Sequence, residues 1–352
     1  MDAVWMLLIW PLMIFVHSGL TAGAAVSCRN EQGESVDWFI LYKLPDHDEG
    51  RGLRYLYMDD HTNGWVYGKK LVNDSKSAVG QTLQPFLSYI HKKTVDFGYL
   101  LYNDQPPKSF KPAPSSFGHS KGIVMLDRQT GVWLVHSTPE LPDVKNNSTS
   151  FWPSSGHENA QTFFCGTYTY STFKDIAVQL QYIHVYSFDY HVPQTFHRDL
   201  QCVAQRTCYP RKEPWFKQLP LTSLAGKTFT SFAKYSRFND DLYSGLLVNY
   251  LGDDFFAKSW GKLHQPLPSN CSVAHKVYNV KTMQLPEARP FSIMVDHSKW
   301  CVTKGGGQHW TCIADTNREI SQMRRGGGAV CTSRPGVWKA FLTVVDTFED
   351  CQ

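Results

Sequence analysis

Short runs of apolar and aromatic residues, separated by polar stretches rich in Gly and Pro, recur along most of the chain. Two such runs, residues 36–42 (VDWFILY) and 97–102 (FGYLLY), are rich in aromatic and branched side chains and end at turn signals, which predicts β-strands. Residues 172–183, 240–251 and 335–348 are predicted helices, the last with a Pro near its first turn. Strands mixed with crossover helices predict an α/β, or mixed α+β, fold of two similar sheets.

Polar segments separate these elements. Residues 105–116 hold four prolines and residues 143–159 carry two glycosylation sequons, so both are predicted loops. Residues 192–220, which contain two cysteines and several prolines, are the best candidate for a link between two halves. We therefore expect an N-terminal half over residues 25–200 and a C-terminal half over residues 201–352.

The N-terminal residues resemble a secretory signal. Residues 5–16 form a run of about a dozen apolar residues, too short to span a bilayer, and residues 22–24 (AGA) offer a cleavage site. We expect residues 1–24 to be a signal peptide, although its first residues carry Asp2 and no Lys or Arg. No later stretch is apolar enough to cross a membrane.

Cysteine usage and sequons agree with secretion. Nine cysteines suit an oxidising compartment, and the odd number leaves one thiol over or pairs it between chains. No cysteine pair has the spacing of a zinc ribbon or finger, so we expect no metal site and no cofactor. The predicted glycosylation sites are Asn73, Asn146, Asn147 and Asn270.

The net charge suggests a partner only in an acidic compartment. The formal charge of +4 becomes +5 once the leader with Asp2 is removed. Thirteen of the fourteen histidines remain in the mature chain and begin to charge near pH ~6.5. A mildly basic protein thus becomes strongly basic where a polyanion would be its substrate, although most of these histidines are expected to be scattered surface residues.

The tripeptide His-Ser-Lys occurs twice, at residues 119–121 and 297–299. In a β-strand the side chains at i and i+2 leave on the same face, so each copy presents an imidazole beside an ammonium group, which suits a phosphate. Each copy is followed by a turn and a Trp, Trp133 and Trp310, and the copies lie 178 residues apart (297 − 119). This context predicts a duplicated half-site and sets aside the third His-x-Lys, residues 91–93.

Two such half-sites suit phosphodiester cleavage without a metal. One imidazole attacks phosphorus, a second protonates the leaving oxygen, and fixed positive charge holds the other oxygens. The candidates for attack, proton transfer and oxygen binding are His119, Lys121, His297 and Lys299. Asp315 and Asn317 follow the second copy and are candidates to orient an imidazole and to bind an oxygen.

Further candidates are less specific. His136 lies one predicted strand after the first tripeptide and is as readily explained as a buried core histidine. Arg324 and Arg325 precede three glycines and are candidate contacts to a polyanion, although a plain Gly-rich loop explains them equally well.

The two His-x-Lys units resemble the half-sites of the phospholipase D superfamily, and longer phrases narrow the resemblance to the deoxyribonuclease II family. It runs from about residue 27 to the C-terminus. The phrases are residues 36–45 (VDWFILYKLP), 101–107 (LYNDQPP), 118–122 (GHSKG), 133–137 (WLVHS), 240–245 (DDLYSG), 296–301 (DHSKWC) and 325–328 (RGGG).

This resemblance implies a lysosomal or secreted acid endonuclease that needs no divalent metal and leaves 3′-phosphate ends. It implies two phospholipase-D-like halves that form a pseudo-symmetric, U-shaped clamp around double-stranded DNA, with the two His-Lys pairs at the centre. His136 matches another histidine on which the family's activity depends. DNA would be held mainly through its phosphates, with little reading of bases. Whether the chain forms a homodimer is left open.

The resemblance also implies a disulfide pattern. It pairs Cys28 with Cys165, Cys271 with Cys351, and Cys312 with Cys331. Cys202 and Cys208 would then be free to pair locally, with Cys301 as the odd thiol. The first half lacks a clear counterpart of Asp315 and Asn317, so the two half-sites are expected to differ in role.

Two other functions remain open from the residues alone. The same histidine chemistry would serve a lysosomal phosphodiesterase that acts on phospholipid or single-stranded nucleic acid. A secreted nucleic-acid-binding or structural glycoprotein with relic His-Ser-Lys units is a third interpretation, which the intact charge pairs in both copies argue against.

Overall fold

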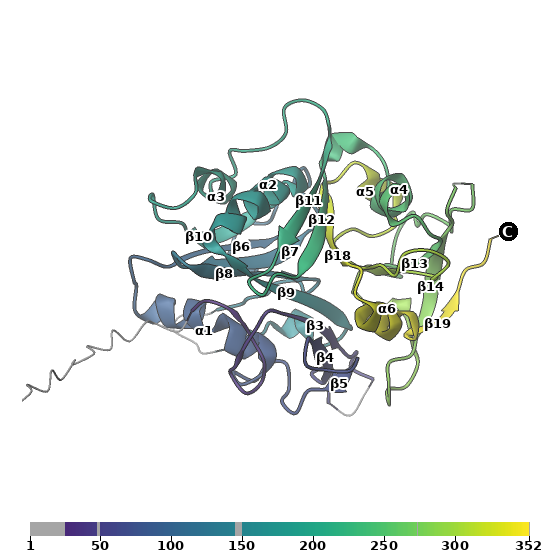
Figure 1. Cartoon of the computed structure of the whole chain (residues 1–352), viewed down its shortest axis with the longest axis horizontal. Coiled ribbons are helices and arrows are strands. Elements are labelled where there is room, and N and C mark those ends of the chain that lie inside the picture. The colour runs from purple at the N-terminus through teal and green to yellow at the C-terminus, as the bar shows by residue number, and fades with distance from the viewer. Residues whose placement is uncertain (1–24, 48–49, 145–149, 273, 352) are drawn as a thin grey trace, which may run out of the picture.

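The computed structural model describes residues 25–47, 50–144, 150–272 and 274–351 (Figure 1). The predicted signal peptide and the sequons at Asn146 and Asn147 lie outside these residues. The fold is mixed α/β, as predicted, with two large sheets and helices against their faces. No helix among the described residues has the length and apolar character needed to cross a membrane.

The first sheet has eight strands in the order β10-β6-β7-β8-β9-β3-β4-β5, and all neighbours are antiparallel. Its strands are β3 (Trp38–Lys43), β4 (Tyr55–Asp59), β5 (Val66–Tyr67), β6 (Gly98–Asn103), β7 (Lys121–Leu126), β8 (Thr130–His136), β9 (Gln161–Thr169) and β10 (Ser187–His191). The strands predicted at 36–42 and 97–102 correspond to β3 and β6. A separate hairpin pairs β1 (Cys28–Arg29) with β2 (Ser35–Val36).

The second sheet has the order β11-β12-β18-β17-β16-β13-β14-β15, and β19 also pairs with β14. Its strands are β11 (Phe216–Thr222), β12 (Thr228–Lys234), β13 (Phe255–Lys258), β14 (Val277–Met283), β15 (Phe291–Ser292), β16 (Trp300–Thr303), β17 (Thr311–Ala314), β18 (Gly327–Thr332) and β19 (Val345–Phe348). Only β13 and β14 run parallel among these described strands.

The two sheets share one core. A single buried cluster contains Trp38 and Trp133 from the first sheet and Trp300 from the second, together with residues of helices α2 (Phe173–Ile183) and α6 (Pro335–Leu342). Helix α1 (Ala78–His91) covers the opposite face of the first sheet (Figure 1). The remaining helices are α3 (Arg198–Ala204), α4 (Val248–Leu251) and α5 (Ile320–Met323).

Three helix predictions have different outcomes. The helix predicted at 172–183 is α2, and the one at 240–251 is a π-helical turn, Leu242–Leu247, that runs into α4. The helix predicted at 335–348 is wrong beyond Leu342, because residues 345–348 form β19. The open edge of β14 pairs with this segment, so sheet formation overrides its helical pattern.

Each large sheet comes from one part of the chain. The strands of the first lie between residues 38 and 191, and those of the second between residues 216 and 348. Residues 192–220, the expected link, contain α3 and the start of β11. The division at residue 200 and the clamp shape stay predictions.

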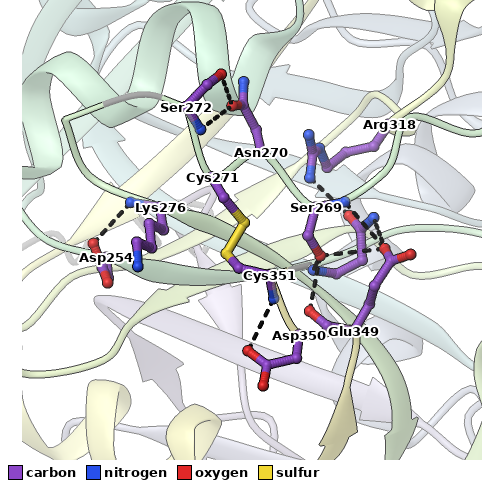
Figure 2. The surroundings of a disulfide bond; sticks show 11 residues. Asp254, Ser269, Asn270, Cys271, Ser272, Lys276, Arg318, Glu349, Asp350 and Cys351 are labelled. Atoms are coloured by element: carbon purple, nitrogen blue, oxygen red, sulfur yellow. Dashed lines mark hydrogen bonds between the residues drawn. A yellow bond between two sulfur atoms is a disulfide. The ribbon is translucent and has the colours of Figure 1, made fainter.

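The disulfides follow the pattern that the resemblance implies. The structure pairs Cys28 with Cys165, Cys271 with Cys351, and Cys312 with Cys331, and it adds the local pair Cys202–Cys208. Cys301 is a free, buried thiol. Figure 2 shows how the Cys271–Cys351 bond ties the C-terminal end to the loop after Ser269. The Cys28–Cys165 and Cys271–Cys351 bonds close long stretches of chain, which reduces the conformational freedom of the unfolded protein.

Candidate active site

The two His-Ser-Lys copies lie where strands begin. Strand β7 begins at Lys121 and β16 begins at Trp300, so the histidines precede the strands; the prediction that each tripeptide lies within a strand is wrong. The turn expected after each copy is confirmed, since β7 pairs with β8 and β16 pairs with β17 in antiparallel hairpins. Residues 91–93, by contrast, lie at the end of helix α1.

Backbone hydrogen bonds between the sheets bring the two copies to one junction. The His119 amide donates to the Gly326 carbonyl, just before β18, and the His297 amide donates to the Ala160 carbonyl, just before β9 (both 2.9 Å). Each histidine is therefore fixed to the sheet that does not carry it. The junction of the two sheets places both histidines.

Asp104 organises the first pair. It follows β6, the neighbour of β7, and its carboxylate accepts a hydrogen bond from His119 Nδ1 at 2.8 Å and another from Lys121 Nζ. Arg325 from the second sheet also contacts this carboxylate, with Nη2 3.3 Å from Oδ2. His119 Nε2 is buried and has no partner among the described residues. The imidazole thus keeps its Nδ1 hydrogen on a carboxylate and has Nε2 available.

Burial and charge set the protonation of this group. Burial raises the pKa of the Asp104 carboxyl, but His119, Lys121 and Arg325 outweigh it and hold that pKa well below the usual range. Burial lowers the pKa of His119 to about 3, against the opposing effect of Asp104. Asp104 is therefore ionised and His119 neutral in the free protein at mildly acidic pH.

The second pair has no carboxylate on its imidazole. His297 Nδ1 lies 2.9 Å from the Ser137 carbonyl oxygen, which makes Nδ1 the donor. Lys299 Nζ donates to the His297 carbonyl at 2.7 Å and lies 3.4 Å from Nε2. The indole of Trp260 packs edge-on against the His297 ring. Both histidines thus hold Nδ1 on an acceptor, but the acceptor is charged only at His119.

The second pair is also strongly electropositive. Burial, and after it the charges of Lys299 and Lys121, lower the pKa of His297 well below its ordinary value. Burial and the charges of Lys121 and Lys258 likewise lower the pKa of Lys299. An anion that enters the site would offset these effects and favour protonation of both groups.

One open pocket of about 430 Å³ contains both histidines. It is also lined by Asp104, Asn317 and Arg325, so groups from both sheets face the same space. The pocket combines two imidazoles with fixed cations and donors in a partly desolvated setting. Such a combination stabilises a phosphate whose charge increases during reaction.

Asn317 and Asp315 have different surroundings: Asn317 lines the pocket, and Asp315 does not. The Asn317 side-chain oxygen accepts from the Trp260 amide at 3.1 Å, which leaves its NH₂ group as a donor in the pocket lining. Asp315 does not contact an imidazole among the described residues: Oδ2 accepts from the Gly328 amide, and Oδ1 has no partner. Burial raises the pKa of Asp315 to about 8. The expected orienting role therefore belongs to Asp104.

Sequence reasoning missed Asp104 as a site residue, although its phrase, residues 101–107, was part of the family resemblance. The residue lies fifteen positions before His119, across a Pro-rich loop. The signal available was an acidic residue at the end of a predicted strand. Nothing local indicates which later strand lies beside it.

His136 is the last residue of β8 and lies close enough to Lys121 to be affected by its charge. Its Nδ1 accepts from the Thr138 amide at 3.2 Å, its ring stacks on Phe163, and its Nε2 has no partner among the described residues. Burial, with the charge of Lys121, lowers the pKa of His136 to about 3. It is a neutral neighbour of the first pair and does not line the pocket.

The two candidate arginines occupy different places. Arg325 donates to the Phe117 carbonyl as well as to Asp104, so it belongs to the site. Arg324 is exposed and donates to Asn239 at 3.1 Å. Of the two described sequons, Asn73 is exposed, and Asn270 is half-buried with its side-chain oxygen accepting from Ser272 (Figure 2).

Two buried lysines donate hydrogen bonds to the turns that precede β18 and β9, where the carbonyls that accept from the His119 and His297 amides lie. Lys234, at the end of β12, donates to the carbonyls of Gln322, Met323 and Arg325 at 2.9, 3.1 and 2.6 Å. Lys43, at the end of β3, donates to the His157 carbonyl at 2.8 Å. Burial lowers the pKa of Lys234 to about 8 and that of Lys43 to about 7.

The side chains of the described residues include no group of three or more His, Cys, Asp or Glu placed to hold a metal ion. The cations next to the histidines are the ammonium and guanidinium groups of Lys121, Lys299 and Arg325. These are the groups available to bind phosphate oxygens.

Comparison with known proteins gives a consistent family match. The family model described as Deoxyribonuclease II matches residues 27–351. Deoxyribonuclease-2-alpha of Mus musculus is 40% identical over 337 residues, 93% of this chain and 94% of that protein. Deoxyribonuclease-2-beta of Mus musculus is 40% identical over 338 residues, 94% of each chain. Plancitoxin-1 of Acanthaster planci is 34% identical over 335 residues, 93% of each.

Proposed function

The chain belongs to the deoxyribonuclease II family and is a nuclease, and we propose that it hydrolyses double-stranded DNA at acid pH without a divalent metal. The observation that carries this proposal is the shared pocket in which the histidines of the two His-Ser-Lys copies, His119 and His297, meet. The family name and the DNase names of the relatives support DNA as the substrate. The products are expected to carry 3′-phosphate ends.

In the proposed reaction His119 is the nucleophile. The Asp104 carboxylate accepts its Nδ1 hydrogen, so the Nε2 lone pair is available and the positive charge that develops on the ring is stabilised. Attack of Nε2 on phosphorus breaks the bond to the 5′-oxygen and leaves the 3′-phosphoryl group on the histidine. Lys121, Lys299 and Arg325 are proposed to hold the non-bridging oxygens.

His297 is the proposed general acid and base. Its Nδ1 is held by the neutral Ser137 carbonyl, and Nε2 donates its proton to the departing 5′-oxygen. The neutral ring then takes a proton from water, which attacks phosphorus, breaks the phosphorus–nitrogen bond and frees His119. The incoming DNA phosphate favours the protonated state of His297 that this step needs, which fits activity at acid pH.

The compartment is part of the same proposal. Disulfides between cysteines far apart in sequence suit the secretory pathway, and a mechanism that needs a protonated imidazole suits the lysosome. We therefore place the enzyme in the lysosome or among secreted proteins. The signal peptide and the two-half clamp on DNA belong to this proposal.

Purified protein incubated with supercoiled plasmid at pH 5 in EDTA tests the activity. We expect nicked and linear DNA, with 3′-phosphates that block extension by a polymerase until a phosphatase removes them. Intact plasmid would contradict the proposal. Faster turnover of phosphatidylcholine or single-stranded DNA than of duplex would favour the phosphodiesterase alternative.

The roles of the histidines have their own test. His119→Ala and His297→Ala are each expected to abolish cleavage without loss of the folded state in circular dichroism. Quenching wild type in alkaline denaturant during turnover of labelled DNA preserves the acid-labile phosphorus–nitrogen bond, and peptide mapping is then expected to find the phosphoryl label on His119. Full activity in either variant, or a label on another residue, would refute the assignment.

A further inference from the structure

A path of aromatic rings and arginines continues from the catalytic junction along the end of the β11–β12 hairpin. We call it the aromatic path; its members are Phe117, His184, Tyr209, Trp215 and Tyr235, with Arg211 and Arg237 at its outer end. None of these residues has a place in the mechanism above. The contacts between them run without a break.

The path begins beside the proposed nucleophile. Phe117 lies two residues before His119, and its backbone carbonyl accepts from Arg325. The Phe117 ring stacks on His184, with centroids 4.4 Å apart and planes 21° apart. The amide of Gly118 donates to the His184 carbonyl at 2.9 Å. The first ring is thus attached to the loop that positions His119.

The middle of the path is a cluster of tyrosines. The His184 ring lies 5.4 Å from Tyr209 and 5.6 Å from Tyr235, and the two tyrosine rings stack at 6.1 Å and 14°. Trp215 lies 6.1 Å from Tyr235, whose amide donates to the Trp215 carbonyl. Tyr209 belongs to the segment between the two sheets, Trp215 directly precedes β11, and Tyr235 directly follows β12. They leave the sheet at the edge where Lys234 holds the Arg325 turn.

The outer end carries two exposed guanidinium groups. Arg211 lies over the Tyr209 ring, 3.8 Å from its centroid, and Arg237 lies over Trp215 at 5.1 Å. In the part of the chain that the structure describes, neither forms an ion pair or a hydrogen bond with a protein group. Stacking holds each guanidinium flat while its donors stay free.

The charge around this end favours an anion. Exposed basic residues outnumber exposed acidic ones: Arg211, Lys212, Arg237 and Arg324 against Glu213 and Asp240. Tyr209 and Trp215 are half-buried, so part of each ring faces solvent. Free guanidiniums over partly exposed rings are the groups that bind the phosphates and sugars of nucleic acid.

We propose that the aromatic path is a second DNA-contact site, which binds the phosphates of the substrate strand beyond the scissile bond through Arg211 and Arg237. The proposal rests on DNA being the substrate. Phe117 and Arg325 join this site to the pocket, so a strand with its scissile phosphate at His119 has a continuous surface to follow. Contacts far from the reacting bond add affinity without changing the chemical step.

The test compares the effect of the same substitutions on a long substrate and on a substrate that fills only the pocket. The double variant Arg211→Gln/Arg237→Gln is compared with wild type on a 30-base-pair duplex and on the nitrophenyl ester of thymidine 3′-phosphate, at pH 5. We expect KM for the duplex to rise roughly tenfold with kcat unchanged, and hydrolysis of the ester to stay at the wild-type rate. The slope of log Kd against log salt concentration is expected to fall by about 2.

A matched control removes the same charge elsewhere. Lys227 lies at the turn end of the same hairpin, and Lys174 in the first turn of α2, whose other end is His184. Lys174→Gln/Lys227→Gln is expected to behave as wild type in KM and salt slope. Equal effects of the two double variants would mean that only net charge matters, and this would overturn the proposal.

Other outcomes are equally decisive. An unchanged duplex KM and salt slope in the arginine variant, or a loss of ester hydrolysis, would overturn the site. The proposal would also be overturned if the arginine variant bound DNA as wild type does but lost binding to anionic phosphatidylserine vesicles. Should wild type cleave neither substrate, the proposed catalytic function fails, and the salt slope of DNA binding still decides the aromatic path.

Discussion

At the scale of single residues, the two proposed catalytic histidines are distinguished by what accepts their Nδ1 hydrogen. His119 has the Asp104 carboxylate, and His297 has the carbonyl of Ser137. A carboxylate stabilises a ring that becomes positive on attack, whereas a neutral carbonyl leaves the ring a better proton donor. This difference is the physical basis for assigning His119 as nucleophile and His297 as acid.

Replacing Asp104 by Asn tests that basis. The amide can keep the shape of the side chain but carries no charge, and its NH₂ group favours the wrong tautomer of His119. We expect kcat on plasmid DNA to fall roughly 10²- to 10⁴-fold, with little change in Kd for DNA. The measurement is single-turnover cleavage at pH 5. A variant with wild-type kcat would remove Asp104 from the mechanism.

Asp315 predicts a dependence of stability on pH. Its pKa of about 8 in the folded protein lies above the ordinary value of 3.8, so its contribution to stability is complete below pH ~4 and is lost as the pH rises towards 8. Between pH 5 and pH 7.5 this loss amounts to about 3 kcal/mol. Asp315→Asn keeps a neutral group and avoids it.

Denaturant unfolding of wild type and Asp315→Asn at both pH values measures the effect. The free energy of unfolding of the variant minus that of wild type is expected to be about 3 kcal/mol larger at pH 7.5 than at pH 5, which means that the variant is relatively more stable at pH 7.5. Asp96→Asn, which alters an exposed carboxylate, is the control. The same relative stability at both pH values would show that Asp315 ionises normally.

At the scale of elements, the ends of strands position the side chains of the candidate site. Strands β6, β7, β9, β12 and β18 end or begin at the junction, and the loops attached to them carry Asp104, His119 and Arg325. Lys234 pairs in register with Gly327, the first residue of β18, and its ammonium group holds the preceding turn. In the first sheet Lys43 pairs with Gln161, the first residue of β9. Each sheet thus uses a buried lysine to hold the turn before an inner strand.

Lys234→Met tests this positioning. Three carbonyls lose their donor, so the turn is expected to loosen and to displace Arg325 from Asp104. We expect kcat at pH 5 to fall roughly 10- to 100-fold, because small displacements of catalytic groups are costly. Lys227→Met, on the same hairpin but at its turn, is expected to retain full activity. Equal activity of the two variants would refute the role of Lys234.

At the scale of the whole molecule, the active site exists only where the sheets meet. Each histidine amide is bound to the opposite sheet, and the shared core keeps the junction rigid. Burial, and after it the cations gathered there, lower the pKa of His297 and Lys299, so the free protein holds fewer protons at this site than its groups would hold in water. A DNA phosphate is expected to reverse this and to bring protons with it.

Proton uptake on binding is therefore a prediction. Calorimetry of His119→Ala with a short duplex at pH 5, in two buffers of different ionisation enthalpy, is expected to show uptake of about one proton per bound site. Uptake is expected to decrease when His297→Ala is added. If binding heats do not depend on the buffer, DNA does not change the protonation of the site.

The local features of this protein follow from its sequence alone. Apolar and aromatic patterns located β3, β6 and α2, the repeated His-Ser-Lys marked both half-sites, and the matched phrases indicated the family and its disulfides. These features depend on residues close together in the chain or on long matched stretches. Local geometry and side-chain chemistry are therefore sufficient to predict the strands, the helix and the repeated His-Ser-Lys pattern, whereas the family and its disulfides come from the resemblance.

Which distant residues act together depends on how the whole chain packs. Asp104 reaches His119 because β6 and β7 are neighbours, and Arg325 reaches both across 206 residues or more. Long-range pairing with β14 also makes residues 345–348 a strand. Asp315 accepts a hydrogen bond from the Gly328 amide and not from an imidazole, because β17 and β18 are neighbours. Strand neighbours and burial are set by the packing of the whole chain, so no local pattern contains them.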